Sequence, residues 1–352
     1  MRALLKLLSR ISEPDAALGK QAQAHLDQLT KPPGSLGRLE ELARRVVEIT
    51  GKEPPVVERP VIFTLAGDHG VVAEGVSAYP QVVTAQMLEN FLRGGAAVSV
   101  LARHAGARVV VADFGVAAPM VSHPALALRK VAPGTGNFAR GPAMTRAQAV
   151  QAIESGIGLA EGEVASGCDL IGLGEMGIGN TTAASAITAA LTGAPVESIT
   201  GRGTGIDEAT WERKVAVVRR ALAVNQPDPA DALDVLAKVG GFEIAGLVGV
   251  ILAGAAARIP VVVDGFSAGA AALVAVKLKA EARHFLLASH CSVEPGHRLI
   301  LEHLGLRPYL DLGMRLGEGT GAALAFTLIQ AAVKIYTEMA TFKSAGVSER
   351  RP

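Results

Sequence analysis

Residues 170–182 read LIGLGEMGIGNTT, and this stretch decides the fold. It opens with the short apolar run from Leu170 to Leu173, continues through closely spaced glycines, and leads into a helix expected to begin at Asn180 or Thr181. A buried strand that runs through glycines into a helix is the repeating unit of a parallel sheet with crossover helices. The stretch therefore predicts an α/β protein.

The same alternation recurs on both sides of this stretch. Further short apolar runs predict strands at 61–65, 108–111, 260–263 and 284–287. Alanine-rich segments between them predict helices at 96–103, 146–164 and 268–280. Because strands of this kind are apolar throughout, both faces of the sheet must be covered. We therefore predict a parallel, Rossmann-like sheet with helices on both faces.

The two ends of the chain predict a small helical domain. Residues 13–50 read as two helices interrupted at 29–34, LTKPPG, because neither proline can continue a helix. The last long helix is expected from about Thr320 to Met339, long enough to leave the sheet and pack on the N-terminal helices. We assign residues 1–55 and 330–352 to the small domain, and residues 56–329 to the large α/β domain.

Composition narrows the class of function. The 352 residues carry a formal net charge of +1 and no basic run, so nucleic acid is not an expected partner. Two cysteines cannot form a disulfide framework or a four-thiolate zinc site. The apolar stretches fall short of the roughly 18 residues that a membrane span needs. We expect a reduced, cytoplasmic protein that binds small molecules and no membrane.

The glycine loop approximates two phosphate-binding motifs. Gly172, Gly174 and Gly177 match the dinucleotide-binding pattern, although a further Gly179 precedes the helix. The P-loop pattern is also approached, but Asn180 stands where the phosphate-binding lysine is required. Both motifs share backbone N–H groups and a helix N-terminus that can hold one phosphate. We expect phosphate binding here, with a tight turn that binds nothing as the alternative.

Other polar residues follow the expected strands, at the edge of the sheet where ligands bind. Glu318 lies between two glycines before a long helix, which suits either a carboxylate held close to a ligand or one that satisfies the helix dipole. Lys214 would add a positive charge for a phosphate, or be an exposed helical lysine. The spacing of His290, Glu294 and His297 fits no standard zinc pattern, so no metal is expected. The candidates to line the site are Asp68, His69, Asp264, His290 and Arg315.

A series of short motifs runs in order across nearly the whole chain. They are KPPGSLG at 31–37, GDHGV at 67–71, YPQVVTAQ at 79–86, the loop at 174–182, GRGTG at 201–205, DGF at 264–266, SHCSVEPGH at 289–297 and RLGEGTG at 315–321. The ordered set resembles the nicotinate-nucleotide–dimethylbenzimidazole phosphoribosyltransferase family. The resemblance implies a Rossmann-like sheet, a small domain made from both chain ends, and a homodimer.

The resemblance also implies a reaction. Members of this family transfer 5-phosphoribose from nicotinate mononucleotide to 5,6-dimethylbenzimidazole or a related base, giving α-ribazole 5′-phosphate and nicotinate for the nucleotide loop of cobalamin. The family's general base falls on Glu318, and its base pocket falls near Ser77 and Gln86. The residues expected to bind the nucleotide and its phosphate are Glu175, Gly177, Gly179, Asn180, Gly203 and Lys214. No metal or organic cofactor is expected.

Two other functions stay open at this point. The pattern of Gly172, Gly174 and Gly177 favours a nicotinamide-dinucleotide oxidoreductase, which would leave Glu318 without a role. A non-catalytic sensor would bind nicotinate mononucleotide without releasing nicotinate. The sequence does not rank one benzimidazole against another, because apolar pockets discriminate similar ligands by only about 1–3 kcal/mol per methylene-sized difference.

Overall fold

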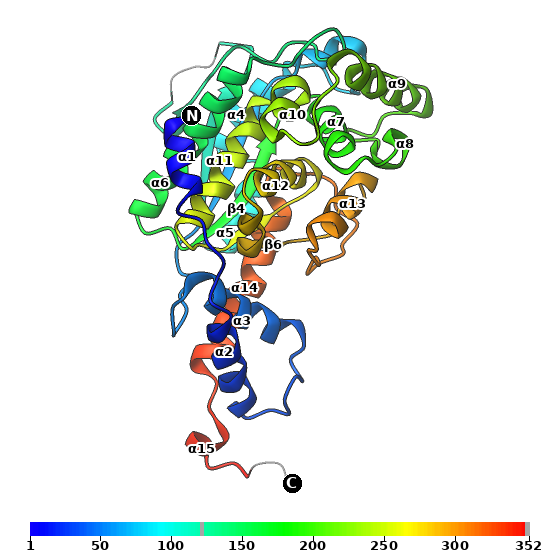
Figure 1. Ribbon diagram of the computed structural model, residues 1–352. Helices are drawn as coiled ribbons and strands as arrows, with labels where there is room; N and C mark the ends of the chain where they lie inside the picture. The colour runs from blue at the N-terminus through cyan, green and yellow to red at the C-terminus, as the bar shows by residue number, and fades with distance from the viewer. Residues whose placement is uncertain (120–122, 349–352) are drawn as a thin grey trace.

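Six parallel strands form the sheet at the centre of the fold (Figure 1). The computed structural model describes residues 1–119 and 123–348 and orders the strands β3-β2-β1-β4-β5-β6. Their bounds are β1 Pro60–Gly67, β2 Arg108–Gly115, β3 Leu126–Leu128, β4 Leu170–Met176, β5 Val261–Val263 and β6 Leu286–Ala288. β1 pairs with both β2 and β4, so the order reverses there, as in doubly wound dinucleotide-binding folds. The predicted α/β fold with a parallel sheet is confirmed.

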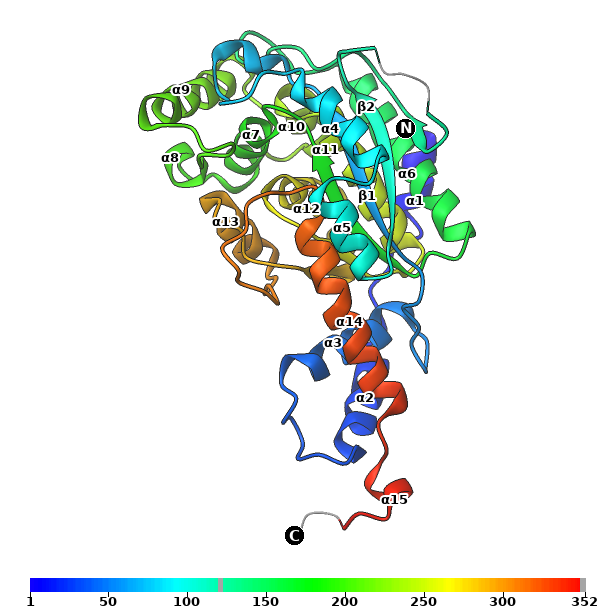
Figure 2. The same cartoon turned by 180° about the vertical axis from the view of Figure 1, so that it is seen from behind.

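Helices cover both faces of the sheet. Their bounds are α1 Arg2–Leu8, α2 Ala16–Gln28, α3 Arg38–Thr50, α4 Val83–Leu92, α5 Ala97–His104, α6 Arg146–Ala165, α7 Asn180–Thr192, α8 Val196–Ile199, α9 Glu208–Asn225, α10 Ala232–Val239, α11 Phe242–Ala256, α12 Phe266–Leu278, α13 Pro295–Leu304, α14 Thr320–Glu338 and α15 Phe342–Ala345. Two short 3-10 helices cover Gly70–Glu74 and Ala280–Phe285. One face is packed by α11 and α12, with α6 outside α11, and the opposite face by α5 and α14 (Figures 1 and 2).

Small residues let α6 and α11 pack closely. A Cβ on Gly156 would collide with the carbonyl oxygen of Gly246, and one on Gly249 would lie 2.8 Å from the backbone nitrogen of Ile157. The two helix backbones therefore touch at these positions, which no larger side chain permits. A core with so few aromatic residues is filled in this way, by close approach of helices rather than by large side chains.

The small helical body contains α2, α3, α15 and the C-terminal part of α14, which runs down from the sheet (Figure 1). His25 of α2 lies 2.9 Å from the carbonyl oxygen of Tyr336 on α14, and the Tyr336 hydroxyl donates to Glu53 over 2.7 Å. Residues 1–55 were assigned to the small domain, but α1 packs on α6 and α11 beside the sheet. Its Leu4 and Leu7 are buried there. Residues 349–352 of the predicted small domain lie outside the described residues.

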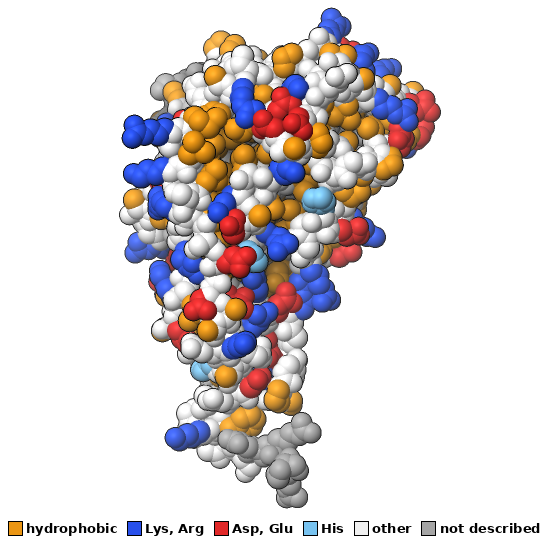
Figure 3. Space-filling view, in the orientation of Figure 1, with side chains coloured by type: hydrophobic (Ala, Val, Ile, Leu, Met, Phe, Trp, Pro, Cys, Tyr) orange, Lys and Arg blue, Asp and Glu red, His pale blue; other side chains and the backbone are white. Residues whose placement is uncertain are grey.

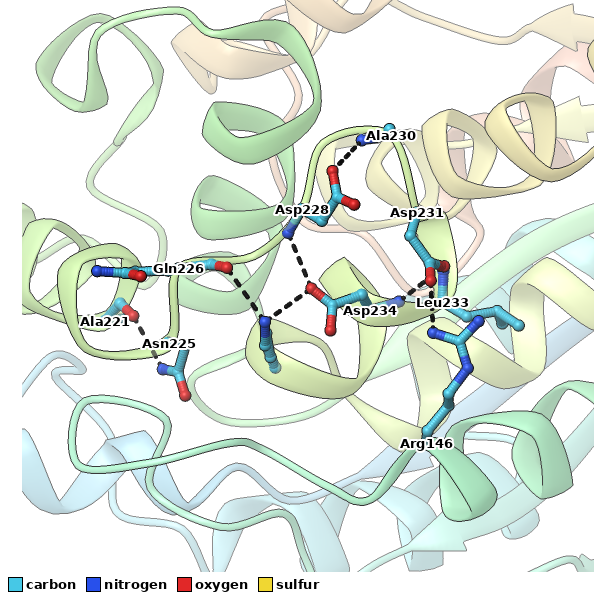
Figure 4. Close-up of polar contacts among 10 residues, drawn as sticks. Arg146, Ala221, Asn225, Gln226, Asp228, Ala230, Asp231, Leu233 and Asp234 are labelled. Carbon is cyan, nitrogen blue, oxygen red and sulfur yellow. Dashed lines mark hydrogen bonds and ion pairs between the residues drawn. The ribbon is translucent and has the colours of Figure 1, made fainter.

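Aspartates fix the connection between α9 and α10 (Figure 4). Asp231 caps α10 by accepting from the backbone nitrogens of Leu233, over 3.0 Å, and Asp234, over 3.2 Å. Its second oxygen pairs with Arg146, at the start of α6, over 2.7 Å. The backbone nitrogen of Asp228 donates to Asp234 over 2.8 Å. Because α10 packs on α7 and α12, these contacts help to hold two helices that begin at the site described below.

Charged side chains of both signs are interspersed over the face of the molecule seen in Figure 3. This mixture agrees with a net charge close to zero. Across residues 1–119 and 123–348, no helix combines the length and the apolar character that crossing a membrane requires.

Candidate active site

A cavity of about 700 Å³ opens beyond the carboxyl ends of the central strands. Segments that follow β4, β5 and β6 form its walls, together with α4 and the loop that precedes α14. In a doubly wound sheet this is the position where ligands bind. The cavity is lined by these sequence-predicted residues: Ser77, Glu175, Gly177, Gly179, Asn180, Gly203, His290, Arg315 and Glu318.

Other predicted residues are not among those that line the cavity. Gln86 is exposed on α4, although Val83 and Met87 of the same helix do line it. Gln86 follows Val83 by three residues and is therefore its neighbour on the surface of α4, beside the residues that line the cavity. The remaining predicted residues outside the lining are buried: Asp68, His69, Lys214 and Asp264.

Asp68 and His69 were predicted to line the site. In the structure both side chains are instead buried in the protein, where each contacts another residue. The Oδ2 atom of Asp68 accepts from the backbone nitrogen of Ala117 over 2.8 Å. The Nε2 atom of His69 lies 2.7 Å from the carboxylate of Glu243, and both side chains are fully buried. Glu243 lies in the first turn of α11, just before a long apolar run, so the sequence offered no sign that it would meet the histidine that follows β1.

The glycines that resemble a dinucleotide motif are required by packing. A Cβ on Gly172 would lie 2.8 Å from the ring of Phe326, because α14 passes close over β4. A Cβ on Gly174 would lie 2.8 Å from the backbone nitrogen of Gly319 and would overlap the carbonyl oxygen of Glu318. These contacts explain the pattern without a dinucleotide.

The loop that carries Glu318 has an unusual backbone. Gly317, Glu318 and Gly319 have φ angles of 82°, 65° and 98°, so three successive residues are left-handed immediately before α14. For a non-glycine residue this conformation costs roughly 1–3 kcal/mol and persists only where the surroundings enforce it. One such contact comes from Thr64 of β1, whose hydroxyl donates to the Glu318 carbonyl oxygen over 3.0 Å.

The carboxylate of Glu318 is suited to accept a proton. Its side chain is buried, and burial raises the pKa of Glu318 to about 7, although a backbone hydrogen bond from Val98 of α5 acts in the opposite direction. The Oε2 atom has no hydrogen-bond partner among the described residues. A base whose pKa is close to the working pH and which has an unoccupied oxygen is well matched to proton transfer.

A second carboxyl group lies nearby on β4. Burial is the main cause that raises the pKa of Glu175 well above its usual range, and the charges of Asp264, Glu243 and Glu318 add to the effect. The Oε2 atom of Glu175 accepts a hydrogen bond from the side-chain amide of Asn180. Because crowded carboxylates resist ionising together, these surroundings favour the protonated form of Glu175.

A buried lysine lies behind the wall of the cavity near α7. The buried Lys214 donates to the Thr181 hydroxyl over 2.9 Å and to the Gly201 carbonyl oxygen over 3.3 Å. Burial lowers the pKa of Lys214 to about 8, and Glu294 partly offsets this. Glu294 also accepts from the backbone nitrogen of Gly203 over 2.8 Å. Lys214 and the N-terminus of α7 favour an anion on this side of the cavity, whereas the Glu294 carboxylate opposes one.

The chain matches known proteins over almost its whole length. A family model described as phosphoribosyltransferase matches residues 11–347. The nicotinate-nucleotide–dimethylbenzimidazole phosphoribosyltransferase of Chloroflexus aggregans is 57% identical over 351 residues, which cover 100% of this chain and 99% of that protein. The protein of the same name from Geobacter sulfurreducens is 59% identical over 349 residues, covering 99% of each chain. The chain belongs to this family.

Solved structures of the phosphoribosyltransferase family share the fold. The crystal structure of CobT from Thermus thermophilus has a TM-score of 0.92 and 51% identity, and the match covers 95% of this chain and 100% of that one. The resemblance carried by the ordered motifs is therefore confirmed over almost the whole length. The oxidoreductase interpretation of the Gly172 pattern is set aside, because the chain belongs to the phosphoribosyltransferase family and because packing explains those glycines.

Proposed function

We propose that the cavity transfers 5-phosphoribose from nicotinate mononucleotide to 5,6-dimethylbenzimidazole or a related base. The products are nicotinate and α-ribazole 5′-phosphate, used in assembling the nucleotide loop of cobalamin. The main support for the proposal is the position and pKa of Glu318. In this chain, a member of the phosphoribosyltransferase family, Glu318 lines the cavity and burial raises its pKa to about 7.

Glu318 acts as the general base. One ring nitrogen of the neutral base attacks C1′ of the ribose while the other nitrogen still carries its proton. Removal of that proton by the Glu318 carboxylate prevents positive charge from building up on the base. The Oε2 atom, which has no partner among the described residues, is available for this contact. General base catalysis of this kind contributes about 10²–10⁴-fold in rate.

The leaving group needs no acid. The pyridine nitrogen of nicotinate mononucleotide is already positively charged, so breaking its bond to C1′ returns an electron pair and neutralises that atom. Attack from the opposite face of the ribose converts the β to the α anomer. The chain therefore has to supply one base and accurate positioning, and positioning alone is a large source of rate enhancement.

Apolar side chains support a slot for the flat base. Val83 and Met87 of α4, Phe266 at the start of α12, and Leu316 beside Glu318 all line the cavity. Apolar lining with few polar groups is typical of sites for planar heterocycles. Ser77 lines the same cavity and remains in the proposed base pocket, whereas Gln86 is not among the lining residues, so that part of the prediction has no support.

The nucleotide is assigned to the glycine-rich side of the cavity. Gly177, Gly179 and Asn180 lead into α7, whose N-terminal N–H groups favour a phosphate. Lys214 lies behind Thr181 and adds positive charge there. The phosphate is thereby held at the end of the cavity formed by α7 and the 201–205 loop.

Lys214→Met is expected to weaken binding of nicotinate mononucleotide by about tenfold, because a positive charge close to the phosphate is lost. The value of kcat should change much less, because Lys214 lies behind Thr181 on the phosphate side of the cavity and not beside the reacting carbon. Titration calorimetry with the nucleotide measures the affinity. Lys334→Met, at an exposed position on α14, is the control, and equal affinities in the two variants would remove Lys214 from the nucleotide site.

The pH dependence of kcat should follow ionisation of Glu318. A protonated Glu318 cannot accept a proton, so kcat should rise as the pH increases through about 7 and level off above it. Steady-state rates at saturating substrates across this range provide the test. A kcat that is constant across neutral pH would contradict the assignment of Glu318 as the base.

Dependence on the acceptor base separates the proposed enzyme from a sensor. Purified protein should release nicotinate from nicotinate mononucleotide when 5,6-dimethylbenzimidazole is present, and much more slowly without it. A sensor would bind the nucleotide and release no nicotinate under either condition. An absence of base-dependent release would therefore reject the proposed reaction.

The proposal includes a cytoplasmic homodimer. Tyr79 and Leu316 line the cavity and yet are 54% and 57% exposed, which is unusual for large apolar side chains at a site that must exclude water. Contact with a second copy of the chain would cover them. Sedimentation equilibrium should give twice the chain mass, and a monomer at assay concentrations would contradict the dimer.

A further inference from the structure

Asp264 lies immediately after β5 and contacts the loop of Glu318. Its side chain is 1% exposed, and it accepts three backbone hydrogen bonds. Oδ2 accepts from Gly319 over 3.0 Å, whereas Oδ1 accepts from Gly321 over 2.6 Å and from Ala322 over 3.2 Å. The sequence suggested that Asp264 lines the site, but its oxygens point to the backbone that carries Glu318.

The loop needs such a contact. Gly317, Glu318 and Gly319 are all left-handed, and nothing in the intrinsic preference of glutamate favours that conformation. Thr64 of β1 holds the carbonyl oxygen of Glu318, and Asp264 holds the N–H of the next residue. The backbone on the C-terminal side of Glu318 is thus fixed between β1 and the segment that follows β5; β1 and β5 are the two strands on either side of β4.

We propose that Asp264 is a positioning residue for the reaction: together with Thr64 it holds Glu318 in its left-handed conformation and so directs the Glu318 carboxylate into the cavity. This role depends on the function proposed above, because it acts through Glu318. It assigns to Asp264 a task that differs from binding either substrate.

The charge of Asp264 distinguishes this role from that of a simple helix cap. Burial raises the pKa of Asp264 to about 7, the three N–H groups lower it, and the charge of Glu318 raises it further. This repulsion is mutual, so removing the charge at position 264 makes Glu318 easier to ionise and lowers its pKa. The other titratable or charged groups around the pair are Glu175 on β4, His290 after β6 and Arg315 in the Glu318 loop.

Asp264→Asn tests the proposal. The amide nitrogen of asparagine cannot accept from a backbone N–H, so at least one of the three hydrogen bonds is lost. We expect kcat to fall by roughly 10²-fold, the effect of a misplacement of about 1 Å at the reacting groups, while the KM for nicotinate mononucleotide stays near the wild-type value. The acid limb of the kcat–pH profile should also move to lower pH, which a loss of folded protein alone would not cause.

Asp113→Asn is the matched control. Asp113 is also a buried carboxylate near the end of a strand, and it accepts from the backbone nitrogen of Val116 over 2.8 Å rather than from the Glu318 loop. Its kcat and pH profile should match those of the wild type. If Asp264→Asn behaves like Asp113→Asn in both respects, the positioning role is wrong.

A double variant tests whether Asp264 acts through Glu318. When two residues serve one function, their effects do not add, so Asp264→Asn combined with Glu318→Gln should be about as slow as Glu318→Gln alone. If the two substitutions instead lowered kcat by the product of their separate effects, the proposal would be overturned. A wild-type protein without base-dependent nicotinate release would reject the proposed function and this role with it, whereas an active wild type and an equally active Asp264→Asn would reject this role alone.

If Asp264→Asn does not fold, Thr64→Val provides a second test of the same proposal. Valine has almost the same shape as threonine but cannot donate to the Glu318 carbonyl oxygen. We expect kcat to fall about tenfold, as for the loss of one hydrogen bond, with the nucleotide KM unchanged. A wild-type kcat in Thr64→Val would then contradict the proposal.

Discussion

Glu318→Gln is expected to lower kcat by about 10²–10⁴-fold while affinity for nicotinate mononucleotide stays close to that of the wild type. Glutamine has nearly the same size as glutamate, so the left-handed loop and its contact with Thr64 should persist. Its amide cannot take the proton from the attacking base. The rate of nicotinate release at saturating substrates measures kcat, and calorimetry measures nucleotide affinity.

Glu302→Gln provides the control for this substitution. Glu302 is an exposed glutamate on α13 and is not among the residues that line the cavity. Its kcat should be unchanged. If Glu318→Gln turned over at a rate close to that of Glu302→Gln, Glu318 would not be the base, and the proton would have to leave by another path.

Gly174→Ala is expected to lower kcat by about 10²-fold, and to lower the free energy of unfolding by about 1–3 kcal/mol. The new methyl group would overlap the carbonyl oxygen of Glu318 and lie 2.8 Å from the backbone nitrogen of Gly319. These are backbone atoms, so no flexible side-chain end can move away. The Glu318 loop itself must shift, and both the activity and the melting temperature report the shift.

Gly158→Ala is the matched control for Gly174→Ala. Gly158 lies on α6, and a Cβ there would have no neighbour within 4 Å among the residues that the structure describes. Alanine in a helix is more favourable than glycine by roughly 0.5–1 kcal/mol, so this variant should be slightly more stable and fully active. A Gly174→Ala protein with wild-type kcat would show that the loop tolerates the methyl group and that its position matters less than proposed.

The sequence predicted most of the sheet because each long strand is a local apolar run. The segment from Leu126 to Leu128 was missed for the opposite reason. β3 has three residues at the edge of the sheet, and Leu126 is buried whereas Leu128 is exposed. β5 and β6 are equally short but buried throughout, whereas β3 is only partly buried, so it is specified mainly by pairing with β2.

A site residue could be predicted where the sequence motif contains both that residue and its neighbours in the site. Glu318 between two glycines, and the glycines before Asn180, are visible in the sequence. The contacts that explain them are not, because they join distant segments: Gly174 meets Glu318, and Asp264 meets Gly319. The same limit explains why local spacing alone made the Gly172 pattern look like a dinucleotide motif.

The most direct test of the central claim is product analysis after incubation of the purified protein with nicotinate mononucleotide and 5,6-dimethylbenzimidazole. We predict that nicotinate and α-ribazole 5′-phosphate form in equal amounts, with the α configuration at C1′ established by nuclear magnetic resonance. Nicotinate release without a base-linked nucleotide, or a nucleotide of β configuration, would contradict direct displacement at C1′ and with it the mechanism assigned to Glu318.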